Sequence, residues 1–247
     1  MIIKTEAIVL RAIEFKESSL IVSLFTRKEG IVSVIAKGAR KPKSKFSAYL
    51  VPGQVLEVVF YNKPTRNIQT LSDTSYLLKL DRLRTDIEKM ALTTTTMELV
   101  GQVLHENEVN EPLFLFITKM LSWLNKREQV SRLIFPYIQL RIIDRIGIGL
   151  QAEENLETNS GFRGYINIES GALSNSPEGE QAIALTDKQF SFLSESLIPG
   201  KKTIFEKKLT KNELSDLIEY LDKYIRYHVE GVKPRKSDDI FATILSH

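Results

Sequence analysis

The sequence predicts an α+β protein with more than one domain: a five-stranded barrel, followed by a mostly α-helical domain with a small β-hairpin insertion. In the first 80 residues, short runs rich in Val, Ile, Phe and Tyr alternate with Gly, Pro, Asn and Lys, as strands and turns do. After residue 80, apolar residues recur at helical spacing behind N-cap residues. We therefore expect domains at 1–80 and 81–247, with 150–180 as the insertion.

Five strands are expected in the first domain, over residues 7–13, 19–26, 31–36, 54–61 and within 67–78. Between the second and third strands, Arg27–Gly30 has the composition of a tight turn, and Gly30 suits a positive φ. Five short strands without a long helix are typical of the oligonucleotide-binding (OB) barrel.

Three helices are expected next. Thr85–Glu88 has the pattern of a capping box for a helix that runs toward His105. Pro112 suits the first turn of a second helix, which continues to about residue 126. A third helix is expected over 128–146, where Pro136 predicts either a kink or a later start.

Residues 150–180 differ in composition, with six acidic residues and one basic residue, Arg163. The segment Phe162–Ile168 alternates like a strand and Glu169–Gly171 resembles a turn, so we expect a hairpin here. Helices resume at the capping-box patterns Thr186–Gln189 and Thr210–Glu213.

Composition limits the function classes. The chain has no cysteine, which excludes disulfides, thiolate nucleophiles and zinc–thiolate sites. The N-terminal segment lacks the apolar core of a signal peptide, and no run approaches the ~18 apolar residues of a membrane span. Residues 1–80 hold 13 Lys and Arg against 6 Asp and Glu, whereas the remainder is mildly acidic. A basic first domain favours a polyanionic partner.

The densest basic segment is Lys37–Lys45, with five positive charges in nine residues and no acid. Its cations are Lys37, Arg40, Lys41, Lys43 and Lys45. Such a loop can follow a phosphate backbone, and the nearby Phe46 and Tyr49 can stack on bases. The alternative is a solvated turn, with Phe46 in the core.

A second basic cluster spans Tyr61–Asn67 and includes Lys63 and Arg66. It joins the last two strands, and in OB barrels that loop flanks the binding face. An ordinary polar turn is the alternative.

Catalytic patterns are weak. The chain has three histidines, His105, His228 and His247, and they are widely spaced. It lacks the glycine pair of a phosphate-binding loop and the GxSxG motif of a nucleophilic serine. We expect no enzyme activity, no cofactor and no metal.

The predicted third helix carries Arg132 and Arg141 among apolar residues. Solvated arginines on a core helix explain this pattern. A groove that binds an acidic peptide tail of a partner is the functional alternative, and Arg132 and Arg141 are the candidate contacts.

At this point the residues resemble those of the RecO family. The segments that carry the resemblance are Glu6–Arg11, Glu17–Arg27, Gly30, Ala36–Arg40, Pro42–Ser44, Gly53–Val58, Leu140–Gly149, Tyr224–His228 and Lys236–Ser237. Residues 85–130 and 150–185 match poorly. Many family members hold zinc in the insertion through paired CxxC motifs, but residues 150–180 contain neither cysteine nor histidine.

The resemblance implies an OB barrel, binding to single- and double-stranded DNA, and annealing of complementary strands. It implies two partners, RecR and the C-terminal tail of the single-stranded DNA-binding protein (SSB), and help in loading recombinase on SSB-coated DNA. It also implies a cytoplasmic, nucleoid-associated protein. An OB-fold RNA-binding protein, a nuclease and a non-catalytic protein adaptor are the alternatives that the residues leave open.

Overall fold

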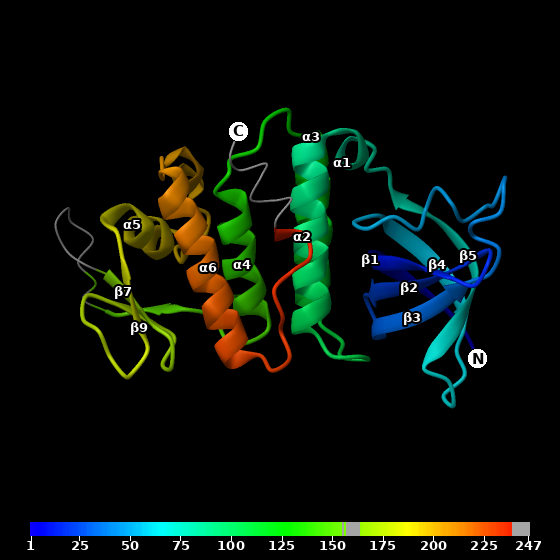
Figure 1. The fold of residues 1–247 in the computed structure, drawn as a ribbon, viewed down its shortest axis with the longest axis horizontal. Helices are drawn as coiled ribbons and strands as arrows, with labels where there is room; N and C mark the ends of the chain where they lie inside the picture. The colour runs from blue at the N-terminus through cyan, green and yellow to red at the C-terminus, as the bar shows by residue number, and fades with distance from the viewer. Residues whose placement is uncertain (155, 157–163, 239–247) are drawn as a thin grey trace. The chain divides into compact units, whose positions relative to one another are not determined.

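The computed structural model of the chain describes residues 1–154, 156 and 164–238 (Figure 1). By their internal contacts these residues form two compact units, each described here by itself. The first contains residues 1–128 and the described part of 235–241, and the second contains 129–234. The domain boundary at residue 80 stays a prediction. No helix in the described part of the chain has the length and hydropathy that crossing a membrane requires.

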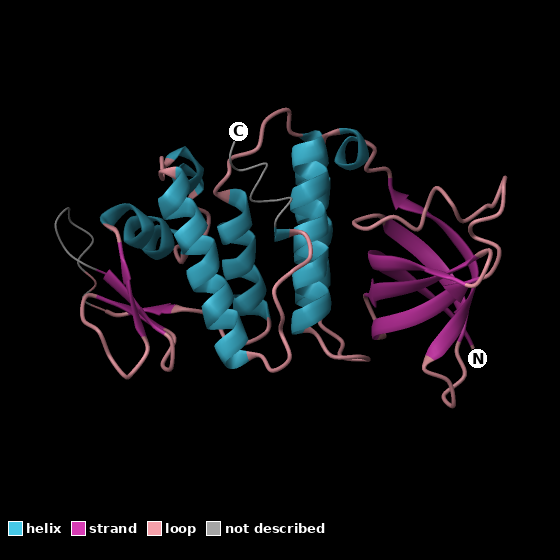
Figure 2. Ribbon diagram, viewed as in Figure 1, coloured by secondary structure: helices cyan, strands magenta, loops and turns pink. Residues whose placement is uncertain are grey.

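Five strands close into a barrel in the first unit (Figure 2). They are β1 (Ile2–Phe15), β2 (Ser19–Thr26), β3 (Gly30–Ala36), β4 (Val55–Tyr61) and β5 (Ile68–Leu78). Their order around the barrel is β1-β2-β3-β5-β4, with a parallel pairing between β3 and β5 and an antiparallel closure of β4 on β1. This topology confirms the predicted OB barrel.

The barrel follows from alternation of apolar residues. Side chains that point inward, such as Val34, Val58 and Phe60, are buried in one core cluster, while their neighbours along the strand are more exposed. The predicted turn residue Gly30 has φ +68°, and a Cβ there would lie 2.5 Å from the carbonyl oxygen of Glu108. Only glycine fits this position.

Three helices follow in the same unit: α1 (Arg82–Thr85), α2 (Ile87–Val103) and α3 (Glu111–Lys126). The capping box predicted at Thr85–Glu88 is wrong. Thr85 is the last residue of α1, and Asp86 caps α2 by accepting the backbone N–H groups of Glu88 and Lys89 at 3.1 and 3.2 Å. Asp86 is the N-cap because Thr85 lies within α1, one residue farther from the start of α2.

The helix α3 begins as predicted, with Pro112 in its first turn and the Asn110 side chain as its N-cap. The rings of Phe25 on β2 and Phe114 on α3 meet edge to face at 5.6 Å. The helix α2 packs against β1. These contacts place α2 and α3 beside the barrel in one unit.

The second unit contains helices and a small sheet. The helices are α4 (Ile134–Arg145), α5 (Asp187–Ser196), a 3₁₀ turn (Lys202–Glu206) and α6 (Lys211–His228). The strands are β6 (Gln151–Ala152), β7 (Gly164–Asn167), β8 (Ala172–Ser174) and β9 (Ala182–Leu185), in the order β6-β8-β7-β9. The predicted hairpin corresponds to β7 and β8, but β6 and β9 extend it into a four-stranded sheet. Phe162 and Arg163 lie outside the described residues.

The helix α4 starts at Ile134, six residues later than the predicted start at 128. Pro136 falls in its first turn, where the missing N–H would have no partner within the helix. Of the two alternatives for Pro136, a later start is therefore correct. Both predicted capping boxes are present, at Thr186 and Thr210.

The small sheet is held by apolar packing and by one asparagine. Ile166, Ile168 and Leu173 are fully buried. Asn167 donates to the Ser174 hydroxyl and accepts the backbone N–H of Glu178, each at 2.8 Å. The cysteine thiolates of a zinc site are absent from the chain. Among the described residues, no three His, Asp or Glu side chains gather in a group that could hold a metal. The absence of zinc from the insertion stays a prediction.

Candidate nucleic-acid interface

The loop after β3 carries the densest basic segment. It is built from consecutive turns over residues 37–49, with positive φ at Gly38 (+70°) and Lys43 (+62°). The Arg40 N–H donates to the carbonyl of Ser18 in the β1–β2 turn at 2.9 Å. The backbone is therefore fixed against the barrel, although it is neither helix nor strand.

Two of its five cations have carboxylate partners. The guanidinium of Arg40 pairs with Glu14 at 2.8 Å and also reaches the carbonyls of Lys16 and Glu17. Lys45 pairs with Asp73 on β5 at 2.9 Å, and this hydrogen bond lowers the pKa of Asp73. Both pairs are exposed, so each contributes little to stability.

The other three cations, Lys37, Lys41 and Lys43, are exposed. Their ammonium groups have no ion-pair or hydrogen-bond partner among residues 1–154, 156 and 164–238. Carboxylates thus engage Arg40 and Lys45, whereas Lys37, Lys41 and Lys43 remain available to an anion.

The stacking role considered for Phe46 is wrong. Phe46 is only 7% exposed and belongs to the barrel core, as the structural alternative predicted. Tyr49 is half-buried and its ring lies 4.4 Å from that of Tyr76. Two other aromatic rings lie near strand ends: Tyr61 is 47% exposed at the end of β4, and Phe15 is half-buried at the end of β1, with the Lys16 ammonium 5.4 Å from its ring centroid.

The second basic loop joins β4 and β5, and Gln69 shapes it. The buried Gln69 amide accepts the Lys63 N–H at 2.8 Å and donates to the carbonyls of Lys63 and Arg66 at 3.3 and 2.6 Å. The side chains of Lys63 and Arg66 are exposed. A buried amide therefore holds the loop while its two cations face solvent.

Strand register relates the two basic loops to one surface. Ser33 pairs with Ile68, directly after the Lys63–Arg66 loop, and Ala36 directly precedes Lys37. The outer face of β1, β2 and β3 between them carries paired rows, Arg11–Ser23–Ser33 and Ile13–Ile21–Ile35. We call this the outer barrel face. It presents aliphatic and hydroxyl groups between two basic loops.

Arg11, Ile13 and Tyr61 were missed as candidate contacts by sequence reasoning. Arg11 and Ile13 are exposed, and both point outward from β1 next to Ser23 and Ile21. Alternation along β1 did not carry this signal, because Ala7 and Val9 face inward and strict alternation would place Arg11 and Ile13 inward as well. The register shift between Val9 and Arg11 turns both side chains outward.

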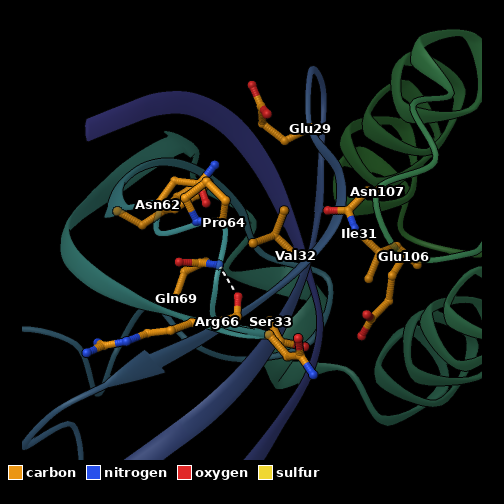
Figure 3. Close-up of a pocket in the computed structure, with 12 residues that line it drawn as sticks. Glu29, Ile31, Val32, Ser33, Asn62, Pro64, Arg66, Gln69, Glu106 and Asn107 are labelled. Atoms are coloured by element: carbon orange, nitrogen blue, oxygen red, sulfur yellow. Dashed lines mark hydrogen bonds between the residues drawn. The ribbon is translucent and has the colours of Figure 1, made fainter. Parts of the chain in front are cut away.

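A pocket of about 280 Å³ opens beside the second basic loop (Figure 3). Val32 and Phe60 form its apolar base, and Asn62, Asn67, Asn107, Glu29 and Glu106 supply hydrogen-bonding groups. Arg66 is the one cation that lines it, and its side chain extends away from the other residues in Figure 3. This lining suits the edge of a planar polar group better than a phosphate.

The predicted partner residues Arg132 and Arg141 have different environments. Arg132 is exposed just before α4. Arg141 is half-buried, donates to the carbonyl of Ser196 and stacks on the Tyr137 ring at 4.9 Å. The guanidinium of Arg141 is thus engaged within its own unit.

Comparison with known proteins gives family matches along most of the chain. The family described as "Recombination protein O N terminal" matches residues 1–77, and "Recombination protein O C terminal" matches 84–238.

The curated relatives named DNA repair protein RecO include the following three. The protein of Salinibacter ruber is 35% identical over 173 residues, which cover 70% of this chain and 66% of the relative. That of Chlorobium phaeobacteroides is 40% identical over 147 residues, covering 60% and 56%. That of Chlorobium limicola is 30% identical over 263 aligned positions, covering all of both chains. In the first two, less than two thirds of the relative's length is matched.

The first family match ends at residue 77, near the end of the barrel, which has the predicted OB topology, and the second begins at residue 84. The alignment with the Chlorobium limicola protein extends over the complete chain. The chain therefore belongs to the RecO family.

Proposed function

We propose that the chain is a recombinational DNA repair mediator, which binds single- and double-stranded DNA and anneals complementary strands. It would also help to load recombinase on SSB-coated DNA. The observation that carries this proposal is the group of three exposed cations at one end of the outer barrel face, Lys37, Lys41 and Lys43, which have no partner among the described residues. The names of the relatives support a role in DNA repair.

Annealing needs no covalent chemistry. Cations that contact phosphates release condensed counterions and reduce the repulsion between two strands. The loop backbone is bonded to the β1–β2 turn through the Arg40 N–H, and its Phe46 side chain is buried in the barrel core. The loop therefore loses little conformational freedom on binding, so more of the electrostatic gain appears as affinity. Lys63 and Arg66 extend the phosphate contacts at the other end of the outer barrel face. We infer that the chain acts without catalysis.

Bases would lie on the outer barrel face itself. Ile13, Ile21 and Ile35 offer apolar contact, and the rings of Phe15 and Tyr61 offer stacking surfaces near the basic loops. Stacking on aromatic rings is tolerant of sequence, which suits a protein that must pair any two complementary strands.

The partners implied by the resemblance, RecR and the SSB tail, remain proposals. For the acidic tail the candidate contacts are Arg132 and Arg141. Arg132 is exposed, and Arg141 is half-buried and bonded to Ser196. A cytoplasmic, nucleoid-associated location is part of the same proposal.

The test is annealing of complementary DNA strands that are precoated with SSB from the same organism. We expect the wild-type chain to accelerate annealing over SSB alone. The triple variant K37A/K41A/K43A should lose most of this acceleration. A control variant, K211A/K223A/R226A, removes three exposed cations from α6 in the second unit and should behave as the wild type.

Two outcomes would overturn the proposal. If the wild-type chain binds bare strands but does not accelerate annealing, it is a general nucleic-acid binder. If the strands are shortened in the presence of magnesium or manganese, the chain is a nuclease.

A further inference from the structure

A cationic cleft lies in the first unit, away from the outer barrel face. It has a volume of about 540 Å³ and is lined by Lys79, Asp81, Arg82, Asn125 and Lys126. Lys79 follows β5, Arg82 begins α1 and Lys126 ends α3. The lining of this open depression therefore has three cations and one carboxylate.

The cleft has a fixed backbone and accessible charges. The Arg82 N–H donates to the Asn125 side-chain oxygen at 3.0 Å, which joins α1 to the end of α3. The neighbouring Leu80 and Leu83 are buried and anchor the chain on either side of Arg82. The charged groups of Lys79, Arg82 and Lys126 are exposed and have no ion-pair or hydrogen-bond partner among the described residues.

The helix dipole explains the positive charge of only one of these three residues. Lys126 lies in the last turn of α3, where a positive charge is favoured by the helix dipole. Lys79 lies outside the helices and Arg82 begins the four-residue α1, so the dipole gives neither a reason to be basic. Their shared position with Lys126 points to an anionic ligand.

The backbone carbonyl of Ala48 connects the cleft to the basic loop. The carbonyl of Ala48 accepts the guanidinium of Arg84, next to the cleft, at 3.3 Å and the hydroxyl of Tyr76 at 2.7 Å. Farther along β5, Lys45 is bound to Asp73. The six residue steps from Asp73 to Lys79 span about 20 Å of extended chain. The exposed Ser75 and Leu77 lie between them and leave this path open.

We propose that the Lys79–Arg82–Lys126 cleft binds phosphates of the same DNA strand that the Lys37–Lys45 loop contacts, which extends the strand path along β5. This inference rests on the proposed function. A polynucleotide fits better than a single phosphate, because the cations come from three separate segments around an open cleft rather than converging on one point. The ligand class is the sugar–phosphate backbone, without preference for base sequence.

The test is equilibrium binding of the full chain to fluorescent single-stranded oligonucleotides of two lengths. The short one, about 8 nucleotides, is within the site size of one OB fold, and the long one has about 30. For the variant K79A/R82A/K126A we expect about tenfold weaker binding of the long strand at low salt. Its slope of log affinity against log salt should be shallower by about 2, since each single-strand phosphate contact contributes about 0.7. The short strand should bind as it does to the wild type.

The control K211A/K223A/R226A removes the same charge from another unit and should bind both strands as the wild type does. Four results would overturn the inference: unchanged binding of the long strand, equal losses for both lengths, an equal loss in the control, or saturable binding of a nucleoside monophosphate that only K79A/R82A/K126A abolishes. The last result would assign the cleft to a mononucleotide. Failure of the wild-type chain to bind either strand would instead refute the proposed function.

Discussion

At the scale of single residues, the cations of the basic loop form two groups, which cannot be told apart from the sequence. Arg40 and Lys45 have carboxylate partners, Glu14 and Asp73, and Lys37, Lys41 and Lys43 have none among the described residues. Glu14 and Asp73 are far from the loop in sequence, so spacing along the chain cannot reveal the pairing.

Residue-scale electrostatics also makes a prediction about stability in the second unit. Burial opposes ionisation of Glu195, but hydrogen bonds from Lys207 and Lys201 outweigh it and lower its pKa from 4.5 to about 2. A carboxyl whose pKa is lower in the folded state stabilises the fold at any pH above its pKa in the unfolded chain. This contribution is lost as pH falls from about 4.5 through about 2.

Glu195→Gln should therefore lower the free energy of unfolding at pH 7 by about 1–2 kcal/mol, after discounting for solvent screening. Urea denaturation of both proteins at several pH values measures this. At pH 3 the difference should be less than half of its value at pH 7. An equal difference at both pH values would show that the charge of Glu195 is not the cause.

At the scale of elements, the helix cap is a direct test of local structure. Asp86 accepts two backbone N–H groups at the start of α2, whereas Thr85 ends α1. Asp86→Ala should lower the free energy of unfolding by about 1 kcal/mol, and Thr85→Ala should change it by less than about 0.5 kcal/mol. Chemical denaturation of the two variants checks this. A larger effect of Thr85→Ala than of Asp86→Ala would instead support Thr85 as the N-cap.

The strands and the longer helices could be predicted because their signals are local. Alternation predicted a strand over 19–26, which is the observed range of β2. The capping boxes at Thr186 and Thr210 predicted the starts of α5 and α6. The short α1 has too few residues to show periodicity, so the cap at Asp86 was missed. The sheet β6-β8-β7-β9 was reduced to a hairpin because the pairings of β6 with β8 and β7 with β9 join segments separated in sequence.

At the scale of the whole molecule, the candidate interface depends on topology that single segments do not encode. The parallel pairing of β3 with β5 brings the Lys63–Arg66 loop to the strand that leads into Lys37. The OB prediction made this arrangement foreseeable, but it did not identify the outer barrel face, the nearby pocket or the cleft at Lys79. Those need the closed barrel and the helices beside it.

The charge distribution agrees with this arrangement. Residues 1–80 carry 13 Lys and Arg against 6 Asp and Glu, and the chain as a whole has a net charge of +3. Basic residues on the barrel attract a polyanion from a distance, and this attraction weakens as salt screens it. Salt dependence is therefore the property that relates the residue-scale charges to binding by the whole molecule.

The most direct test of the central claim is the salt dependence of binding to a single-stranded DNA oligonucleotide, measured by fluorescence anisotropy. For K37A/K41A/K43A, we predict weaker binding and a slope of log affinity against log salt that is shallower by about 2 than for the wild type. The α6 control K211A/K223A/R226A should leave the slope unchanged. A wild-type slope in K37A/K41A/K43A would contradict the account, because it would mean that these three cations do not contact DNA phosphates.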